Sequence, residues 1–248
     1  MDGARGGFNV TRRRLRIAVI DSGVHASHPH ISGVAGGVTI TEDVEENSYV
    51  DLLGHGTAVM AAIQEKAPEA DYFAVRVFER ELRTSVDVLV RAFEWCIAQR
   101  IDLINLSLGT ANPAHAEAFA PLIPRAGLLV SALEINGSPS FPGTLPGVIG
   151  VGLDWDLPRE SYACRTRGKF YASGYPRPIP GVPPERNLSG ISFAVANLTG
   201  FAARVFDGLR DASSNEEVKQ RVVRTLANGS GTAMRSASDA RSIQDLAR

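Results

Sequence analysis

The chain has 248 residues and 44% of them are hydrophobic, which is enough apolar material for one large core. Its 26 basic and 27 acidic residues give a net charge of -1, so it lacks the overall positive field that holds a phosphate backbone. We therefore expect one domain that binds no nucleic acid.

The two ends are expected to lie outside this domain. Residues 1–14 predict a flexible basic segment, residues 15–228 the domain, and residues 229–248 a tail that is loose or partly helical. The arginines at 12–14 and 16 are interpreted as a solvated lead-in to the first strand, with a docking patch as the weaker alternative. No secretory signal and no membrane-length apolar run is evident, which predicts a cytoplasmic protein without a membrane partner.

Strand and helix patterns alternate through the first half of the chain. Arg16–Asp21 is an apolar run that ends in an acid, as expected of a buried parallel strand. Residues 26–50 are expected to be irregular, with an acidic stretch at 42–46. Gly54–Lys66 predicts a loop that leads into a helix. The next predicted elements are a strand over Asp71–Val77, a helix over Ser85–Arg100 and a strand over Leu103–Leu108.

The second half continues this alternation. Pro113–Arg125 predicts a helix with a break near Pro121, and residues 154–189 a proline- and glycine-rich region with short strands. Strands are predicted over Leu128–Leu133 and Val148–Leu153, and helices over Ser192–Leu209 and Glu216–Ala227. The pattern predicts an α/β fold of three layers, with a mostly parallel central sheet and helices on both faces. Sites in such sheets lie beyond the carboxyl ends of the strands, where Asp21 is expected.

The two cysteines have no metal-ligand spacing. Cys96 falls in an apolar helical pattern and is expected to be a buried free thiol, whereas Cys164 falls in a polar loop. A disulfide between them is an open alternative. The sequence predicts neither a cofactor nor a required metal.

Three short segments carry residues for nucleophilic catalysis. They are IAVIDSG at 17–23, GHGTA at 54–58 and SGISFA at 189–194. Ser192 supplies a hydroxyl at a helix start, His55 an imidazole between two glycines, and Asp21 a carboxylate that orients a base. Taken singly, the segments predict a turn, a tight loop and a helix cap. Together, in the chain order Asp, His, Ser, they predict a catalytic triad.

These segments resemble the subtilases, the subtilisin-like serine peptidases, over about residues 16–205. The resemblance implies a subtilisin-like fold and a serine endopeptidase whose triad is Asp21, His55 and Ser192. It also implies that a peptide or protein substrate binds as an extended strand along Ser107, Leu108 and Gly109. The alternative for that segment is a plain strand end followed by a turn.

The sequence departs from the family pattern at several points. The family motif GTSMASP reads GISFAVA at 190–196, with the nucleophile and its glycine kept. The family's oxyanion asparagine aligns with Ile135, so the hole is expected to use Asn136 through a one-residue bulge, or the backbone N–H of Ser192; a simple turn at Asn136–Gly137 is the alternative. Glu134 aligns with the wall of the pocket for the residue before the cleaved bond. It predicts a preference for a basic residue there, a narrowed pocket or an exposed loop acid.

The resemblance, with no inhibitory pro-domain and no signal evident, predicts an intracellular processing enzyme, for example one that removes leader peptides. Two alternatives stay open: a triad acyl transferase or macrocyclase, and an impaired pseudopeptidase that binds peptides or serves as a scaffold. The sequence indicates no oligomeric state.

Overall fold

A nine-stranded sheet runs through the middle of the protein, in a computed structural model that describes residues 13–165, 169–209 and 214–229. The strand order is β10-β11-β9-β6-β5-β1-β4-β2-β3. The pairs from β11 to β4 and β2 are parallel, and the outermost pair at each edge is antiparallel. The strands are β1 (Arg16–Asp21), β2 (Gly36–Ile40), β3 (Glu45–Glu46), β4 (Asp71–Arg76), β5 (Leu103–Leu106), β6 (Leu128–Ala132), β9 (Val148–Leu153), β10 (Tyr162–Arg165) and β11 (Lys169–Ala172).

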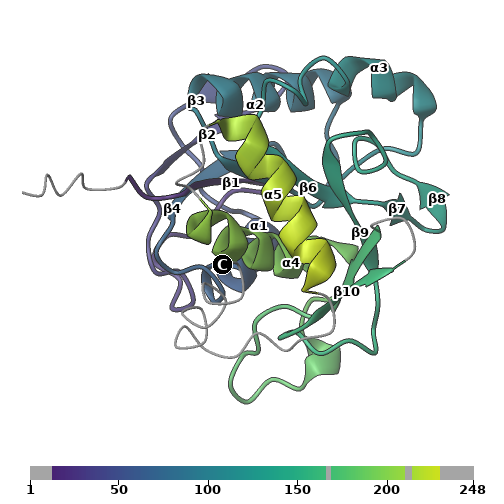
Figure 1. Cartoon of the computed structure of the whole chain (residues 1–248). Coiled ribbons are helices and arrows are strands. Elements are labelled where there is room, and N and C mark those ends of the chain that lie inside the picture. The colour runs from purple at the N-terminus through teal and green to yellow at the C-terminus, as the bar shows by residue number, and fades with distance from the viewer. Residues whose placement is uncertain (1–12, 166–168, 210–213, 230–248) are drawn as a thin grey trace, which may run out of the picture.

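Helices cover both faces of this sheet, as the alternating pattern predicted (Figure 1). One face carries α1 (His55–Gln64), α4 (Ile191–Gly208) and α5 (Asn215–Asn228), and the other carries α2 (Val86–Ala98) and α3 (Ala116–Phe119). Alternate residues of β1 serve the two cores. Ile17 and Val19 pack with α1 and α4, whereas Ala18 and Ile20 pack with α2. The predicted three-layer fold is confirmed.

Two regions differ from their predicted structure. Residues 26–50 were expected to be irregular, but β2 pairs in parallel with β4 and β3 pairs with β2. The strand β2 begins with two glycines, which are uncommon in strands and hide it in the sequence. Glycine is needed at position 37 because a Cβ there would lie 2.2 Å from the Ala74 carbonyl oxygen. The helix expected over 113–125 is a 3₁₀ turn, η1 (Pro113–His115), followed by α3, which ends at Phe119. Pro121 has no backbone N–H to continue the helical hydrogen bonds.

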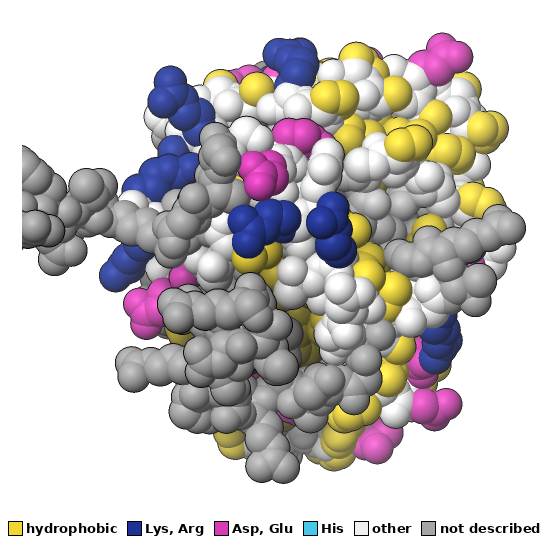
Figure 2. Space-filling view, in the orientation of Figure 1, with side chains coloured by type: hydrophobic (Ala, Val, Ile, Leu, Met, Phe, Trp, Pro, Cys, Tyr) yellow, Lys and Arg dark blue, Asp and Glu magenta, His cyan; other side chains and the backbone are white. Residues whose placement is uncertain are grey.

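The beginning of the described chain is tied to the sheet. Arg13 forms a bidentate pair with Asp102, with both N–O distances at 2.7 Å, and the Arg16 guanidinium lies 4.5 Å above the Phe73 ring. Residues 1–12 and 230–248, which make up most of the predicted terminal segments, lie outside the described residues. On the face shown in Figure 2, basic and acidic side chains are scattered among each other.

Both cysteines are free thiols. Cys96 is buried on α2 as predicted, and burial raises its pKa far above the ordinary value. Cys164 lies on β10 and not in a loop, which corrects the prediction. No helix within the described part of the chain is long and apolar enough to cross a membrane.

Strand order reverses at β1, and this reversal places the site. From β1 the chain builds β2 and β4 on one side and then β5, β6 and β9 on the other. Loops that leave the carboxyl ends of β1 and β5 therefore part in opposite directions, and the point between them is the usual ligand position in such sheets. Asp21 ends β1, and Ser107 follows the end of β5.

Candidate active site

Asp21 is a buried carboxylate at the carboxyl end of the central strand. Its side chain is 1% exposed, and its Oδ1 accepts hydrogen bonds from the Ser22 N–H and from His55 Nδ1, each at 2.7 Å. A carboxylate only accepts hydrogen bonds at neutral pH, so His55 Nδ1 carries the proton. The second ring nitrogen, Nε2, is then free to accept a proton.

His55 is the first residue of α1, and the glycines on either side of it fix the backbone there. Gly54 has φ of 77°, a left-handed conformation that favours glycine. A Cβ at Gly56 would lie 2.3 Å from the Gly23 carbonyl oxygen. Gly56 therefore lets the start of α1 approach the turn after β1, which brings His55 to Asp21.

Asp51 holds the loop in front of His55 and was not singled out from the sequence. Its carboxylate accepts hydrogen bonds from the backbone N–H groups of Leu53, Gly54 and Thr57 and from the Thr57 hydroxyl, at 2.5–2.9 Å. It also accepts from the Ser22 hydroxyl at 2.8 Å. Burial opposes the charge of Asp51, but these hydrogen bonds outweigh it and lower the pKa of the carboxyl group. Asp51 thus joins the Asp21 turn to the His55 turn.

Replacing Asp51 with asparagine is expected to lower the free energy of unfolding by about 2 kcal/mol, because charge-assisted hydrogen bonds are lost at a half-buried site. The lowered pKa means that this stability is present above the unfolded-state value near 3.8 and is lost as pH falls through the folded-state value. Urea denaturation at pH 7 and pH 3 measures both effects. The exposed Asp156→Asn is the matched control, and equal stability of the two variants at pH 7 would contradict the assignment.

The Asp21 carboxylate tunes the imidazole of His55. Burial on its own disfavours the charged ring, but the hydrogen bond and the negative charge of Asp21 outweigh it, so the pKa of His55 is raised above 6.5. The ring is 14% exposed, which leaves it a path to a ligand.

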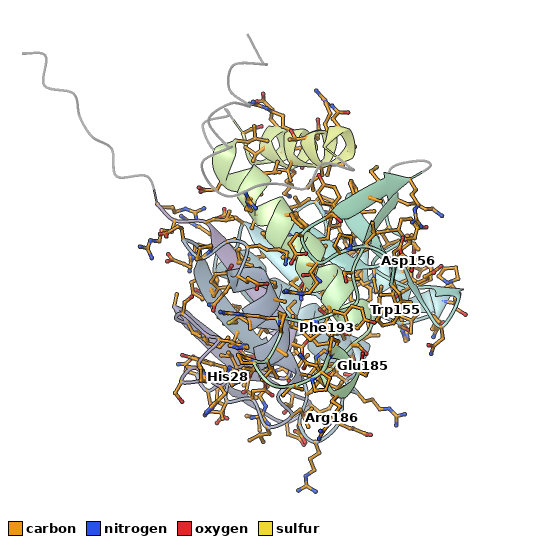
Figure 3. All side chains as sticks on the ribbon, turned by 90° about the horizontal axis from the view of Figure 1, so that it is seen from below. His28, Trp155, Asp156, Glu185, Arg186 and Phe193 are labelled. Atoms are coloured by element: carbon orange, nitrogen blue, oxygen red, sulfur yellow. The ribbon has the colours of Figure 1, made fainter. Side chains whose placement is uncertain are left out.

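Ser192 is the second residue of α4, next to the helix cap. Gly190 caps this helix with φ of 138°, a conformation that a residue with a side chain rarely adopts. The Ser192 hydroxyl donates to the Ser107 carbonyl oxygen at 3.3 Å, and no hydrogen bond joins it to His55 within the described structure. The following residue, Phe193, brings the two segments together, since its ring centroid lies 5.7 Å from that of His55. In the view of Figure 3, Phe193 lies between the loop of His28 and the loops of Trp155 and Glu185.

A buried chain of polar side chains supports Ser192 from below. The Ser107 hydroxyl donates to the Ser192 carbonyl oxygen at 3.2 Å and accepts from Asn105 Nδ2 at 2.8 Å. Asn105 Oδ1 accepts from the Thr199 hydroxyl at 2.9 Å. Ser107 was predicted from the sequence, but Asn105 and Thr199 were not, because a polar residue inside an apolar strand or helix carries no local signal of its partner.

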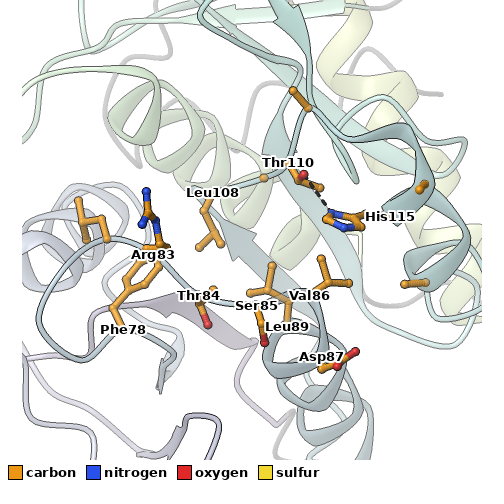
Figure 4. A pocket seen from close by; sticks show the side chains of 15 residues that line it. Phe78, Arg83, Thr84, Ser85, Val86, Asp87, Leu89, Leu108, Thr110 and His115 are labelled. Carbon is orange, nitrogen blue, oxygen red and sulfur yellow. Dashed lines mark hydrogen bonds between the residues drawn. The ribbon is translucent and has the colours of Figure 1, made fainter.

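A groove of about 850 Å³ begins at the segment beside Ser192 (Figure 4). Leu108 and Gly109 of the predicted substrate segment line it, and Ser107 does not. Substrate binding along this segment stays a prediction. Phe78, just after β4, and Val86 and Leu89, at the start of α2, supply the apolar part of the lining. His115 lies on the far side with Nδ1 3.1 Å from the Thr110 hydroxyl. His115 could not be predicted as a groove residue, because a single histidine in a loop can have many roles.

Asn136 lies at the tip of a hairpin formed by β7 (Glu134–Ile135) and β8 (Ser138–Pro139). Asn136 and Gly137 have φ of 52° and 77°, as a two-residue hairpin turn requires. This geometry supports the turn interpretation and gives the asparagine–glycine pair a structural reason. Its part in an oxyanion hole stays a prediction.

Glu134 is exposed on β7, where it pairs with Pro139 of β8. The Leu133 carbonyl oxygen accepts from the Ser140 N–H at 3.0 Å, and Phe141 pairs with Thr110. The 140–141 segment therefore separates Glu134 from the Gly109 wall, and a selective role of Glu134 stays a prediction. Within the described ranges, histidine, cysteine and acidic side chains form no group of three or more that could hold a metal ion.

The sequence is similar to known peptidases. The family model described as "Subtilase family" matches residues 12–152. Subtilisin E of Bacillus subtilis (strain 168) is 30% identical over 213 residues, which are 77% of this chain and 53% of that protein. The chain thus spans about half the length of several subtilisins that it matches. The intracellular serine protease of Paenibacillus polymyxa is 26% identical over 259 residues, covering 92% of this chain and 79% of that one.

Two solved structures share the fold. A cold adapted subtilisin-like serine proteinase has a TM-score of 0.65 at 21% identity, covering 92% of this chain and 85% of that one. A lanthipeptide protease has a TM-score of 0.63 at 18% identity, covering 83% of this chain and 78% of that one.

Proposed function

Because the chain belongs to the subtilase family, we propose that it hydrolyses peptide bonds with Ser192 as nucleophile, His55 as general base and Asp21 as the residue that orients the base. The observation that carries this proposal is the 2.7 Å hydrogen bond between His55 Nδ1 and the buried Asp21 carboxylate at the carboxyl end of β1.

In the proposed reaction the Ser192 hydroxyl oxygen attacks the carbonyl carbon of the peptide bond while its proton passes to His55 Nε2. The tetrahedral intermediate then collapses, the C–N bond breaks, and the leaving amine takes the proton from His55. Water attacks the acyl-enzyme by the same route and releases the acid. Asp21 stabilises the imidazolium in both halves, in line with the raised pKa of His55.

The hydroxyl of Ser192 must first leave the Ser107 carbonyl oxygen and turn toward His55. A peptide that adds as a strand along Ser107–Gly109 needs that same carbonyl as an acceptor. Substrate binding therefore favours the turned hydroxyl. Catalytic hydrogen bonds commonly form only in the substrate complex, which agrees with the 3.3 Å bond to Ser107 in the free protein.

For the oxyanion we assign the backbone N–H of Ser192 as a donor, because N–H groups in the first turn of a helix lack helical partners. For the substrate we assign a peptide or protein whose acyl side lies in the groove beside Leu108 and Gly109, which polar and apolar side chains line together. Similarity to an intracellular serine protease and to a lanthipeptide protease supports a processing role inside the cell, such as leader-peptide removal.

Reaction with a fluorophosphonate probe tests this function. We expect the wild-type protein to be labelled on Ser192, and both Ser192→Ala and His55→Ala to lose labelling, as read by intact mass and peptide mapping. Ser32→Ala is the matched control: it removes an exposed hydroxyl beside Gln64, at the end of α1 away from His55, and labelling should persist. Folded wild-type protein that stays unlabelled would instead favour the peptide-binding pseudopeptidase, the alternative that the turn at Asn136 and the altered 190–196 motif support.

A further inference from the structure

Lys66 is a buried cation that the proposed mechanism does not use. It lies two residues beyond the end of α1, and its side chain is 9% exposed. Burial is the main reason that its pKa is lowered to about 8. Its Nζ donates to Asn197 Oδ1 at 2.7 Å, and Asn197 lies on α4, five residues after Ser192.

The protein has a shaped place for this side chain. A Cβ added to Gly200 would lie 2.8 Å from Cβ and Cδ of Lys66, so the glycine makes room for the aliphatic stem. The ammonium lies 5.5 Å from the centroid of the Phe201 ring. The stem and the charged end of Lys66 are thus both fixed against α4.

Asn197 has its whole amide committed to neighbours. It is fully buried, and its Nδ2 donates to the Ser173 carbonyl oxygen at 2.9 Å and to the Tyr175 carbonyl oxygen at 3.0 Å. Because both protons are used on that side, Oδ1 must face Lys66. The lysine therefore determines whether this buried oxygen has a hydrogen-bond donor.

The segment 173–175 in turn holds the start of α4. Gly190 N–H donates to the Gly174 carbonyl oxygen at 2.8 Å, and Gly190 is the cap two residues before Ser192. One path of hydrogen bonds thus runs from Lys66 through Asn197 and the 173–175 backbone to the turn that aims the Ser192 hydroxyl.

Lys66 is the most buried cation of a small network of ion pairs around Glu65. Glu65 Oε2 lies 3.7 Å from its Nζ and is also paired with Arg159, while Arg177 Nε lies 4.0 Å from Glu65 Oε1. Glu160 favours the charged lysine from the same loop as Arg159, and Arg159 disfavours it. From α4 the neutral Asn197 and Phe201 face the ammonium.

We propose that Lys66 is a positioning residue for the nucleophile: through Asn197 and the 173–175 backbone, its ammonium fixes the Gly190 cap and so the direction of the Ser192 hydroxyl. This inference rests on the proposed function for its effect on catalysis. Its structural half, the link from Lys66 to Gly190, holds independently of any reaction.

The kinetic test replaces Lys66 with methionine, which keeps the stem and removes the ammonium. We expect kcat at pH 7 to fall about 10-fold with KM within about 2-fold, because small errors in nucleophile placement slow the chemical step. Wild-type kcat should also fall as pH rises past about 8, and this step should be missing in the variant.

Lys219→Met is the matched control for a buried lysine. Lys219 on α5 also has a pKa lowered by burial, and its Nζ donates to the Ala126 carbonyl oxygen at 2.6 Å, outside the path to Gly190. It should keep the wild-type kcat and pH profile. Folded Lys66→Met with unchanged kcat and an unchanged profile would overturn the proposal, as would equal losses in both variants.

A second measurement needs no activity. In Ser192→Ala protein the backbone amide resonance of Gly190 is expected to titrate with a midpoint near 8, the pKa of Lys66. In the double variant with the milder Lys66→Gln, which keeps a donor for Asn197, this titration should disappear. A Gly190 resonance that does not shift near pH 8, or that shifts equally in both proteins, sinks the proposed path even if the peptidase assignment is correct. Wild-type protein that the fluorophosphonate probe does not label would contradict only the peptidase assignment.

Discussion

Replacing Ser192 with alanine is expected to lower kcat for peptide hydrolysis about 10⁶-fold, the scale measured for the nucleophile of subtilisin, which is a relative of this chain. The variant loses the attacking oxygen but keeps the groove beside Leu108 and the backbone N–H groups at the start of α4. A residual rate about 10³-fold or more above that in water should therefore persist.

Digestion of a peptide library by the wild type, followed by mass spectrometry, identifies a substrate for the kinetics and shows whether Glu134 selects lysine or arginine.

The same library supplies the control for this prediction. A double variant, His55→Ala with Ser192→Ala, should be no slower than Ser192→Ala alone, because the two side chains act as one unit. Additive losses would mean that His55 and Ser192 work separately. A Ser192→Ala protein within about 10-fold of the wild type would show that the hydrolysis takes place elsewhere.

Local pattern was sufficient to predict the strand and the helix that carry Asp21 and His55, two candidate catalytic residues. The apolar run before Asp21 is long enough only for a buried strand, and the small residues after His55 allow a helix to pack on α4. Those segments form β1 and α1, with the carboxylate and the imidazole 2.7 Å apart. Each motif encodes its own turn, and a parallel sheet brings the turns to one edge.

Partners that are distant in the chain could not be predicted in the same way. Asn105 bonds Thr199, and Lys66 bonds Asn197 from 131 residues away. From the sequence, a single polar residue in an apolar segment is interpreted as exposed to solvent or as a local cap. Its true partner is known only from the fold. The same limit hid Asp51, whose five hydrogen bonds come from residues on two different turns.

Asn136 illustrates a third kind of limit. The motif alignment placed an asparagine near the expected oxyanion position, and the same letters encode a hairpin turn. The positive φ angles at Asn136 and Gly137 show that the backbone uses the pair as a turn. A residue type was readable from the sequence there, but its conformation depended on the pairing of β7 with β8.

Asp21→Asn is expected to lower kcat about 10⁴-fold, less than loss of the nucleophile, because the hydrogen-bond geometry survives while the charge and the tautomer control are lost. His55 acts as a base only when neutral, so wild-type kcat/KM should rise with pH through a midpoint above 6.5, where Asp21 has raised the pKa of His55. The variant should show a lower midpoint. A pH–rate profile of each protein measures both effects, and an unchanged midpoint would remove Asp21 from the triad.

The stability of the fold should depend on pH in the opposite direction. His55 has a higher pKa in the folded protein than the 6.5 of an ordinary histidine, so its ion pair with Asp21 stabilises the fold fully below pH 6.5. That contribution is lost as pH rises through the folded-state pKa, over the same range in which the free base gains activity. Urea denaturation across this range should show the loss in the wild type and not in Asp21→Asn, which separates a charge effect from a general loss of structure. One carboxylate then accounts for both trends.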